Sequence, residues 1–203
     1  MYADIILLAI ISFFLVVKLI SILGQKNESA GSAKFTTVNA SGAPETVVVV
    51  DKNLTPKDQL KLLDPGFSES RFLDNSIEAF KMILEIYAKG DTRILSELVD
   101  IDTLKKFAYP ISARDELAQV CEINILKINS AAIENIKIDG NIVDIAVKYS
   151  AEAVMTVKTG AGKLIAGHEN KIEQINDSWV FRRNVKSPDP TWKLVGIGAV
   201  PLE

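Results

Sequence analysis

The side chains best suited to chemistry are few in this chain, and each stands alone. The one histidine, His168, is flanked by Gly167 and Glu169, and the one cysteine, Cys121, lies in the apolar-rich run from 120 to 128. A histidine without a second, suitably spaced ligand does not form a recognisable metal site. A single cysteine excludes an internal disulfide, and within an apolar strand it behaves as a small hydrophobic residue. We therefore expect a surface histidine, a packed cysteine and no metal site.

The sequence also gives little support for acid-base catalysis or phosphate binding. No pair of carboxylates is placed for catalysis, because Asp139 falls in a predicted turn and Asp144 points away from an apolar row. The stretch from Gly160 to Lys163 lacks the spacing of a phosphate-binding loop and is expected to be a hairpin tip. We therefore expect no catalytic residue and no cofactor. A proton-transfer role for a carboxylate or for Tyr87 inside a hollow remains as an alternative.

Composition argues against one class of partner. The formal net charge is −3 over 203 residues, whereas nucleic-acid-binding domains usually carry a strongly basic face. We expect no nucleic-acid partner.

The N-terminal segment has the composition of a membrane anchor. The run from Ile5 to Leu23 is apolar except for two serines and Lys18, and a helix of this length just spans the ~30 Å hydrocarbon core. Asp4 precedes the run, Lys18 lies near its C-terminal end and Lys26 follows it, which is the reverse of a cleaved signal peptide. Both lysines are candidate contacts for lipid headgroups. A signal peptide and a buried core helix are the alternatives.

Charge around this segment predicts its orientation. By the positive-inside rule, Lys18 and Lys26 place the residues that follow in the cytoplasm and leave the N-terminus outside. No Arg-rich, Ser-rich transit peptide precedes the apolar run. We expect residues 1–24 to be a single-pass anchor in a bacterial inner membrane, in contact with the bilayer through Ile5 to Leu23.

Residues 25–63 are predicted to be a flexible linker with one short apolar segment. Small and polar residues dominate from 25 to 44, and such a stretch buries too little surface to offset its chain entropy. The exception is the β-branched run Thr46-Val-Val-Val-Val50, bounded by Glu45 and Asp51. This run is an isolated strand candidate that could pair with a sheet edge of the same domain or of a partner.

Residues 64–203 are predicted to form one domain that begins with helices. After the chain break at 64–66, apolar residues recur at helical spacing and define one face: Leu73, Ile77, Phe80, Leu84 and Tyr87. Gly90 is expected to end this helix and Asp91 to cap a shorter one. A third helix begins near Asp102, and Pro110 is expected to end or kink it.

Beyond residue 119 the period changes from 3.6 to 2. Strand-like runs are expected at 120–128, 133–138, 142–155, either side of 160–162, 172–183 and 192–197. Asp139-Gly140 is a two-residue hairpin signal. Helices followed by alternating strands predict an α+β domain, in which helices pack on one face of a curved antiparallel sheet.

The C-terminal strands carry the most specific pattern in the sequence. Trp179-Val-Phe181-Arg-Arg183 followed by Pro190-Thr-Trp192-Lys-Leu194 resembles the closing signature of the Tim44-like domain family, the membrane-anchored bacterial relatives of the mitochondrial import-motor tether. Asp64-Pro65 and Gly90-Asp91 are similar to the start and end of that family's opening helix. The resemblance implies a cystatin-like or nuclear-transport-factor-like roll, no catalytic activity, and an adaptor role with a chaperone, translocase or membrane-protein client.

Two features depart from the family pattern. Tyr109-Pro110 interrupts the third helix, where the resemblance implies an unbroken one. The linker lacks a long charged segment, so chaperone binding carries over poorly.

Six apolar side chains form the candidate site, on the expected long helix and the last two strands. These side chains either pack as core or line a hollow for an acyl chain or an amphipathic helix. The six residues are Phe80, Leu84, Tyr87, Trp179, Phe181 and Trp192.

Three basic residues near the C-terminal strands are expected to make different contacts. Arg182 and Lys186 are candidate contacts for lipid headgroups on a tethered domain. Arg183 ends the apolar row of Trp179 and Phe181, so we expect it to pair with a carboxylate that the sequence does not identify.

Two functional hypotheses follow. The first is a membrane-anchored, non-enzymatic adaptor for protein translocation or membrane-protein biogenesis. The alternative is a small-molecule or lipid-binding roll, with isomerase-like activity as one form of it. A carboxylate of raised pKa inside the hollow would favour the alternative.

Overall fold

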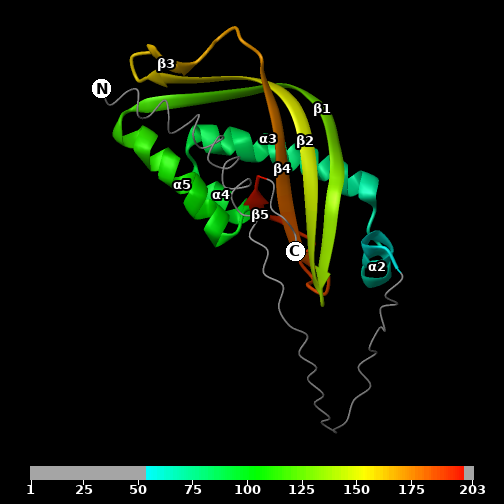
Figure 1. Cartoon of the computed structure of the whole chain (residues 1–203). Helices are drawn as coiled ribbons and strands as arrows, with labels where there is room; N and C mark the ends of the chain where they lie inside the picture. The colour runs from blue at the N-terminus through cyan, green and yellow to red at the C-terminus, as the bar shows by residue number, and fades with distance from the viewer. Residues whose placement is uncertain (1–53, 199–203) are drawn as a thin grey trace, which may run out of the picture.

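The computed structural model describes residues 54–198, in which four helices pack on one face of a five-stranded antiparallel sheet (Figure 1). This confirms the predicted α+β class. The predicted anchor over 1–24, with Lys18 and Lys26, and the valine run lie outside the described residues. Among the helices between 54 and 198, none has both the length and the apolarity needed to cross a bilayer.

The first described helix, α2 (Pro56–Leu63), lies within the segment 25–63 that was predicted to be a linker, so that prediction is wrong at its C-terminal end. Thr55 caps its N-terminus, because the Thr55 Oγ1 accepts from the Asp58 N–H at 3.2 Å, and Pro56 occupies the first turn. Leu60 is completely buried in the core. The folded part therefore starts before residue 64, at a helix whose apolar face is too short to stand out in the sequence.

The long helix α3 (Glu69–Lys89) has the predicted inward face. Phe80, Leu84 and Tyr87 are buried, and Leu73 and Ile77 pack against the core. Gly90 ends the helix in the left-handed conformation, with φ of 76°, and its N–H donates to carbonyls of the last turn.

Helices α4 (Thr92–Leu98) and α5 (Ile101–Glu116) follow, and Asp91 caps α4 as predicted. Pro110 does not end α5, which continues to Glu116. The carbonyl that loses its donor belongs to Lys106, which is exposed, so water can replace the missing N–H. Buried Arg114 of α5 donates from Nη2 to the Tyr87 carbonyl at 2.8 Å and lies over the Tyr87 ring, joining α5 to the end of α3.

The sheet has the strand order β1-β2-β4-β5, with β3 paired to β2. The strands are β1 (Gln119–Asp139), β2 (Ile142–Thr159), β3 (Leu164–Gly167), β4 (Glu173–Asn184) and β5 (Lys193–Ile197). The hairpin signal at Asp139-Gly140 is confirmed, since Asp139 pairs with Ile142.

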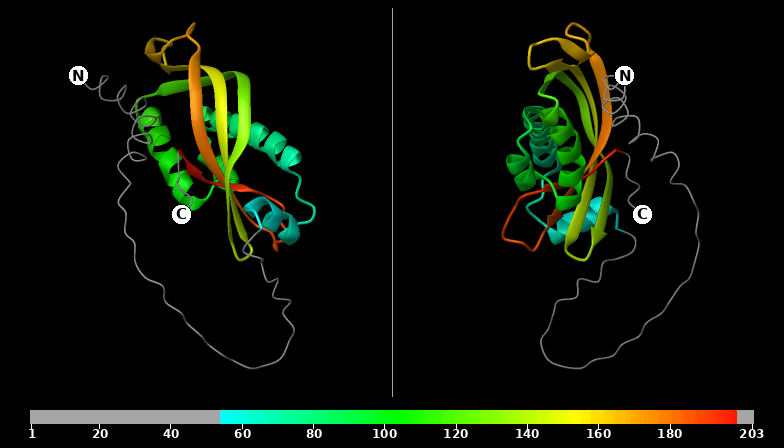
Figure 2. Two further views of the ribbon diagram at one scale, coloured as in Figure 1. Left: turned by 45° about the vertical axis from the view of Figure 1, so that its right-hand side comes forward. Right: turned by 90° about the vertical axis from the view of Figure 1, so that its left-hand side faces the viewer.

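Two strands that were predicted separately, over 120–128 and 133–138, form the single strand β1. Register shifts against β2 at three places break its periodicity, which explains why one long strand reads as two. Such bulges bend a strand. The bent strands are visible in Figure 2, where the helices lie on one side of the sheet.

The covered face of the sheet holds the core. On β2 the predicted inward row of Val143, Ile145, Val147 and Tyr149 is completely buried. The matching row of β4 carries Trp179 and Phe181, which are also buried.

An aromatic cluster joins α3 to the two central strands. The Phe80 ring stacks on Tyr149 with centroids 4.5 Å apart and lies 4.6 Å from the Trp179 ring. The Tyr149 hydroxyl donates to the Ser76 carbonyl at 3.1 Å, and burial raises the pKa of this phenol. A turn of α3 is thereby placed over β2.

Replacement of Trp179 with alanine tests this cluster. Trp179 is 1% exposed, so its removal should lower the free energy of unfolding by about 3–5 kcal/mol. Tyr109→Ala, at a residue that is 78% exposed, is the control and should change stability by less than about 0.5 kcal/mol. Denaturation followed by far-UV circular dichroism measures both, and a loss below about 1 kcal/mol for Trp179→Ala would contradict the packing described.

Candidate binding groove

An apolar groove opens at the N-terminal end of α3, where that helix meets β4 and the β4–β5 connection. Its volume is about 250 Å³, and it is lined by Phe72, Asn75, Ser76, Ala79, Phe181, Pro190, Thr191 and Trp192. Aromatic rings form its walls and amide and hydroxyl groups lie among them, a combination typical of sites that bind apolar side chains.

Three aromatic side chains shape the groove. Phe72 meets Trp192 nearly edge-on with centroids 5.0 Å apart, and it meets Phe181 at 86° with centroids 6.1 Å apart. Trp192 is only partly buried, whereas Phe72 and Phe181 are buried. Trp192 is therefore the wall that a ligand would contact most.

Core packing and a hollow were the two alternatives for the six candidate residues, and four of them pack as core. Phe80, Leu84, Tyr87 and Trp179 are closed inside the core and line no groove. Phe181 and Trp192 do line one.

Sequence reasoning missed the α3 side of the groove. Phe72, Ser76 and Ala79 follow one another at spacings of four and three, in continuation of the apolar face that holds Phe80. That period could have identified them, and the small side chain of Ala79 explains why space remains beside them.

The predicted partner of Arg183 is Asp64. Arg183 Nη1 lies 3.0 Å from Asp64 Oδ2, and both side chains are mostly buried, with 17% and 18% exposed. The same guanidinium lies 5.9 Å from the centre of the Trp192 ring. The pair therefore joins the end of α2 to the end of β4 and stands behind the exposed wall of the groove.

A second cleft, of about 330 Å³, has Arg183 of this ion pair in its lining. Asp100, Arg182, Arg183, Asp189 and Lys193 contribute its charged lining. Acids and bases are mixed here, so the cleft has no strong preference for ligands of one charge.

The two candidate headgroup contacts of the domain differ in their surroundings. Arg182 is held by Asp144 through two bonds of 2.7 Å, from Nε and from Nη2. Lys186 is exposed. Contact of either residue with lipid remains a prediction.

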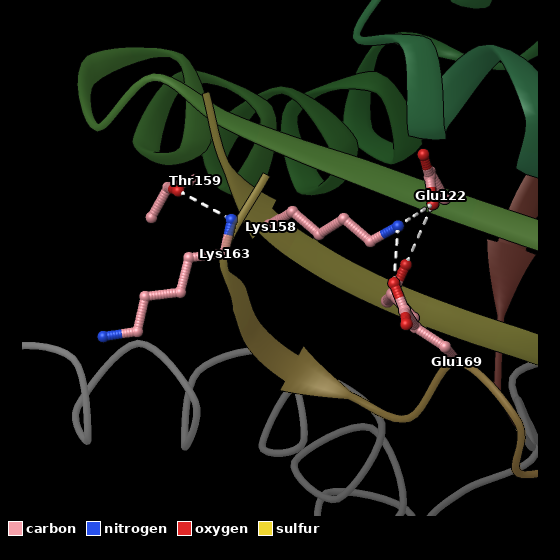
Figure 3. A network of polar contacts seen from close by, with 6 residues as sticks. Glu122, Lys158, Thr159, Lys163 and Glu169 are labelled. Atoms are coloured by element: carbon pink, nitrogen blue, oxygen red, sulfur yellow. Dashed lines mark hydrogen bonds and ion pairs between the residues drawn. The ribbon is translucent and has the colours of Figure 1, made fainter. Parts of the chain in front are cut away.

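The far end of the sheet carries the residues around His168 and the Gly160–Lys163 stretch. Lys158 Nζ lies 3.0 Å from Glu122 and 2.9 Å from Glu169, and the Lys163 N–H donates to Thr159 Oγ1 (Figure 3). These bonds hold the 160–163 turn and the start of the next loop, which confirms the predicted hairpin tip. His168 is exposed, and the described residues contain no group of metal-ligand side chains.

Asp177 is the carboxylate with the most unusual surroundings, and the sequence analysis missed it. It shares the inward row of β4 with Trp179 and accepts from Trp179 Nε1 at 3.0 Å and from the Ser178 N–H at 2.9 Å. Burial raises its pKa, although these donors oppose the shift. Asp177 precedes Trp179 by two residues, so strand alternation places both side chains on the same face, and this spacing could have identified Asp177. Asp177 lines neither cleft.

The helices on a bent antiparallel sheet define an α+β domain, with a candidate binding groove at one end. The chain belongs to the Tim44-like domain family, whose model matches residues 57–199. This confirms the family suggested by the tryptophan pattern.

Two relatives illustrate the range of the family. The chain is 24% identical to the uncharacterized protein RP434 of Rickettsia prowazekii, over 97% of both chains. It is 25% identical to the mitochondrial import inner membrane translocase subunit TIM44 of Mus musculus, over 70% of this chain and 32% of that protein, so it spans about a third of the mouse protein. Among solved structures, the intermembrane space region of the chloroplast protein ARC6 matches with a TM-score of 0.43 and 14% identity, over 65% of this chain and 96% of that one.

Removal of the Asp64 carboxylate should loosen the groove wall. In Asp64→Asn the largely buried guanidinium of Arg183 loses its counter-charge, which should reduce stability by about 1–3 kcal/mol. In a Trp179→Phe background Trp192 is the only tryptophan, and its fluorescence should become more accessible to acrylamide. Asp74→Asn, on the exposed side of α3, is the matched control. If Asp64→Asn and Asp74→Asn lose the same stability and leave Trp192 equally accessible to acrylamide, the ion pair does not support the wall.

Asp177 should make stability depend on pH in a defined direction. Because its folded-state pKa is raised, its contribution is full below the unfolded pKa of about 3.9 and is lost as the pH rises through the folded pKa. Asparagine keeps an acceptor for Trp179 and does not titrate. The stability of Asp177→Asn relative to the unaltered chain should therefore increase from pH 3 to pH 8. Urea denaturation across this range measures it, and a constant difference, like that expected for exposed Asn176→Ala, would refute the assignment.

Proposed function

We propose that this protein is a membrane-anchored, non-enzymatic adaptor that presents its groove to a protein partner at the inner face of a bacterial membrane. Membership of the Tim44-like family and similarity to a subunit of the mitochondrial import translocase support a role linked to protein translocation. The partner is then a translocase component, a chaperone or a membrane-protein client.

The observation that carries this proposal is the groove with the partly buried Trp192. Tryptophan is enriched among the residues that dominate protein interfaces, because one side chain buries a large apolar area at small entropic cost. A volume of about 250 Å³ lies below the ~300–1,000 Å³ usual for small-molecule pockets. It suits one or two apolar side chains that project from a partner's helix or extended segment.

The N-terminal sequence supports the membrane part of the proposal. The run from Ile5 to Leu23 supplies the anchor, and 25–44 supplies the flexible part of the connection. A flexible chain of this length has a reach of about 25 Å, at ~5–6 Å × √n. Tethering within this distance raises the concentration of the groove near membrane-bound partners. A periplasm-dependent enzyme fused after Glu203 should be inactive, and its activity would contradict the orientation.

One observation favours the alternative of a small-molecule site with proton transfer. Asp177 has the raised pKa that a general base needs. Its carboxylate, however, is engaged by Trp179 and Ser178, and it has no access to the groove. A general base must come within hydrogen-bond reach of the proton it removes. The adaptor is therefore the better-supported function.

Site-directed photo-crosslinking distinguishes the two functions. A photoreactive residue at Thr191, in the groove, should capture a defined protein in native membranes, and the same residue at exposed Met82 should not. Trp192→Ala should reduce capture at least tenfold, while Met82→Ala leaves it unchanged. Mass spectrometry of the purified chain is the second arm. A stoichiometric small molecule, with no protein captured in a Trp192-dependent way, would overturn the adaptor in favour of the alternative.

A further inference from the structure

Strand β1 leaves one side of the sheet open. It pairs with β2 along its whole length, from Gln119 to Asp139, and among residues 54–198 no strand pairs with its other side. Near its C-terminal end, the Ile136 N–H donates to the side-chain Oδ1 of adjacent Asn135 at 2.8 Å. This is the local bond that an edge N–H forms when no neighbouring strand accepts it. An edge of this length without a second partner strand is a template for another strand.

The apolar core also continues to this edge without being fully covered. The inward residues of β2 are completely buried, but those of β1 are mostly only partly buried, although they pack against the core. This incompletely covered row consists of Ile123, Ile125, Ile128, Ile133 and Ile138. One more strand beside β1 would cover side chains of this row and satisfy edge backbone groups at the same time.

We propose that residues 46–50 of the same chain, Thr-Val-Val-Val-Val, add a strand to the free edge of β1 beside its C-terminal half. The segment is β-branched throughout, which suits a strand with one face on the isoleucine row. This inference does not rest on the adaptor function.

The start of the described chain supports this occupant. Asp64, at the end of α2, pairs with Arg183, and Arg183 lies opposite Val143, which pairs with Ile138. Helix α2 therefore lies at the same end of the sheet as the C-terminal end of β1, as Figure 1 shows. Val50 precedes Leu54 by four residues, or about 14 Å of extended chain. Such a short connection gives an effective concentration in the millimolar range.

The short connection favours this segment over a second copy of β1, because a segment joined through four residues competes at a millimolar effective concentration. Exposed acids and bases are mixed on β1, where Lys137 lies between Glu134 and Asp139 in the sequence, so charge does not decide between the two occupants.

Hydrogen exchange on the full chain in mild detergent tests the proposal. Amides of 47–50 should exchange at least tenfold more slowly than those of 36–40. Val47→Pro combined with Val48→Pro removes donors on both sides of the segment, and should abolish this protection and accelerate exchange at 133–139 at least tenfold. Exchange at 179–181 should not change. Val38→Pro is the control and should have no effect on β1.

Disulfide trapping supplies an independent measurement. In a Cys121→Ala, Lys137→Cys background, cysteine placed in turn at positions 47 to 50 should form an intramolecular bond at alternate positions, and Val38→Cys should not. Three results would overturn the proposal: exchange at 47–50 as fast as at 36–40, protection that rises with protein concentration, or trapping that yields only dimers. The last two would assign the edge to a second copy.

Discussion

The contact of Phe80 with Tyr149 and Trp179 is the interaction on which the rest of the domain depends. Each of these side chains buries roughly 150–250 Å², or about 4–6 kcal/mol at ~25 cal/mol per Å². The contribution is several times that of a partly exposed ion pair, so the aromatic cluster decides how α3 lies on the sheet. The bond from the Tyr149 hydroxyl to the Ser76 carbonyl then places one turn of the helix over β2.

The position of the groove follows from this cluster. Because Phe80, Trp179 and Tyr149 fill the space beneath the middle of α3, room for a ligand remains only toward the start of the helix, beside the small side chain of Ala79. Trp192 reaches this place from the β4–β5 connection, where the Asp64–Arg183 pair supports it. The core therefore sets the place of the groove, and a polar contact at the surface completes its wall.

Local patterns predicted most of the fold, and long-range contacts explain what they missed. The inward face of α3, its end at Gly90 and the alternation of β2 each depend on residues close in sequence, and periodicity identified them. The need of Arg183 for a carboxylate followed from its place in an apolar row, but Asp64 is 119 residues away and only the fold brings it there. Likewise, α2 is recognisable only because Leu60 enters a core formed by later segments.

The inward surface of the sheet supports the proposed adaptor over the alternative of an enzymatic roll. Catalysis in such a fold requires an open inner face and a titratable group that faces the substrate. Here large aromatic side chains close that face, and the one inward carboxylate with a raised pKa accepts hydrogen bonds from Trp179 Nε1 and the Ser178 N–H. Asp177 therefore orients the tryptophan that fills the core. The side chains that would line a reaction chamber instead fill the core, and the proposed recognition site lies at its rim, where Trp192 is only partly buried.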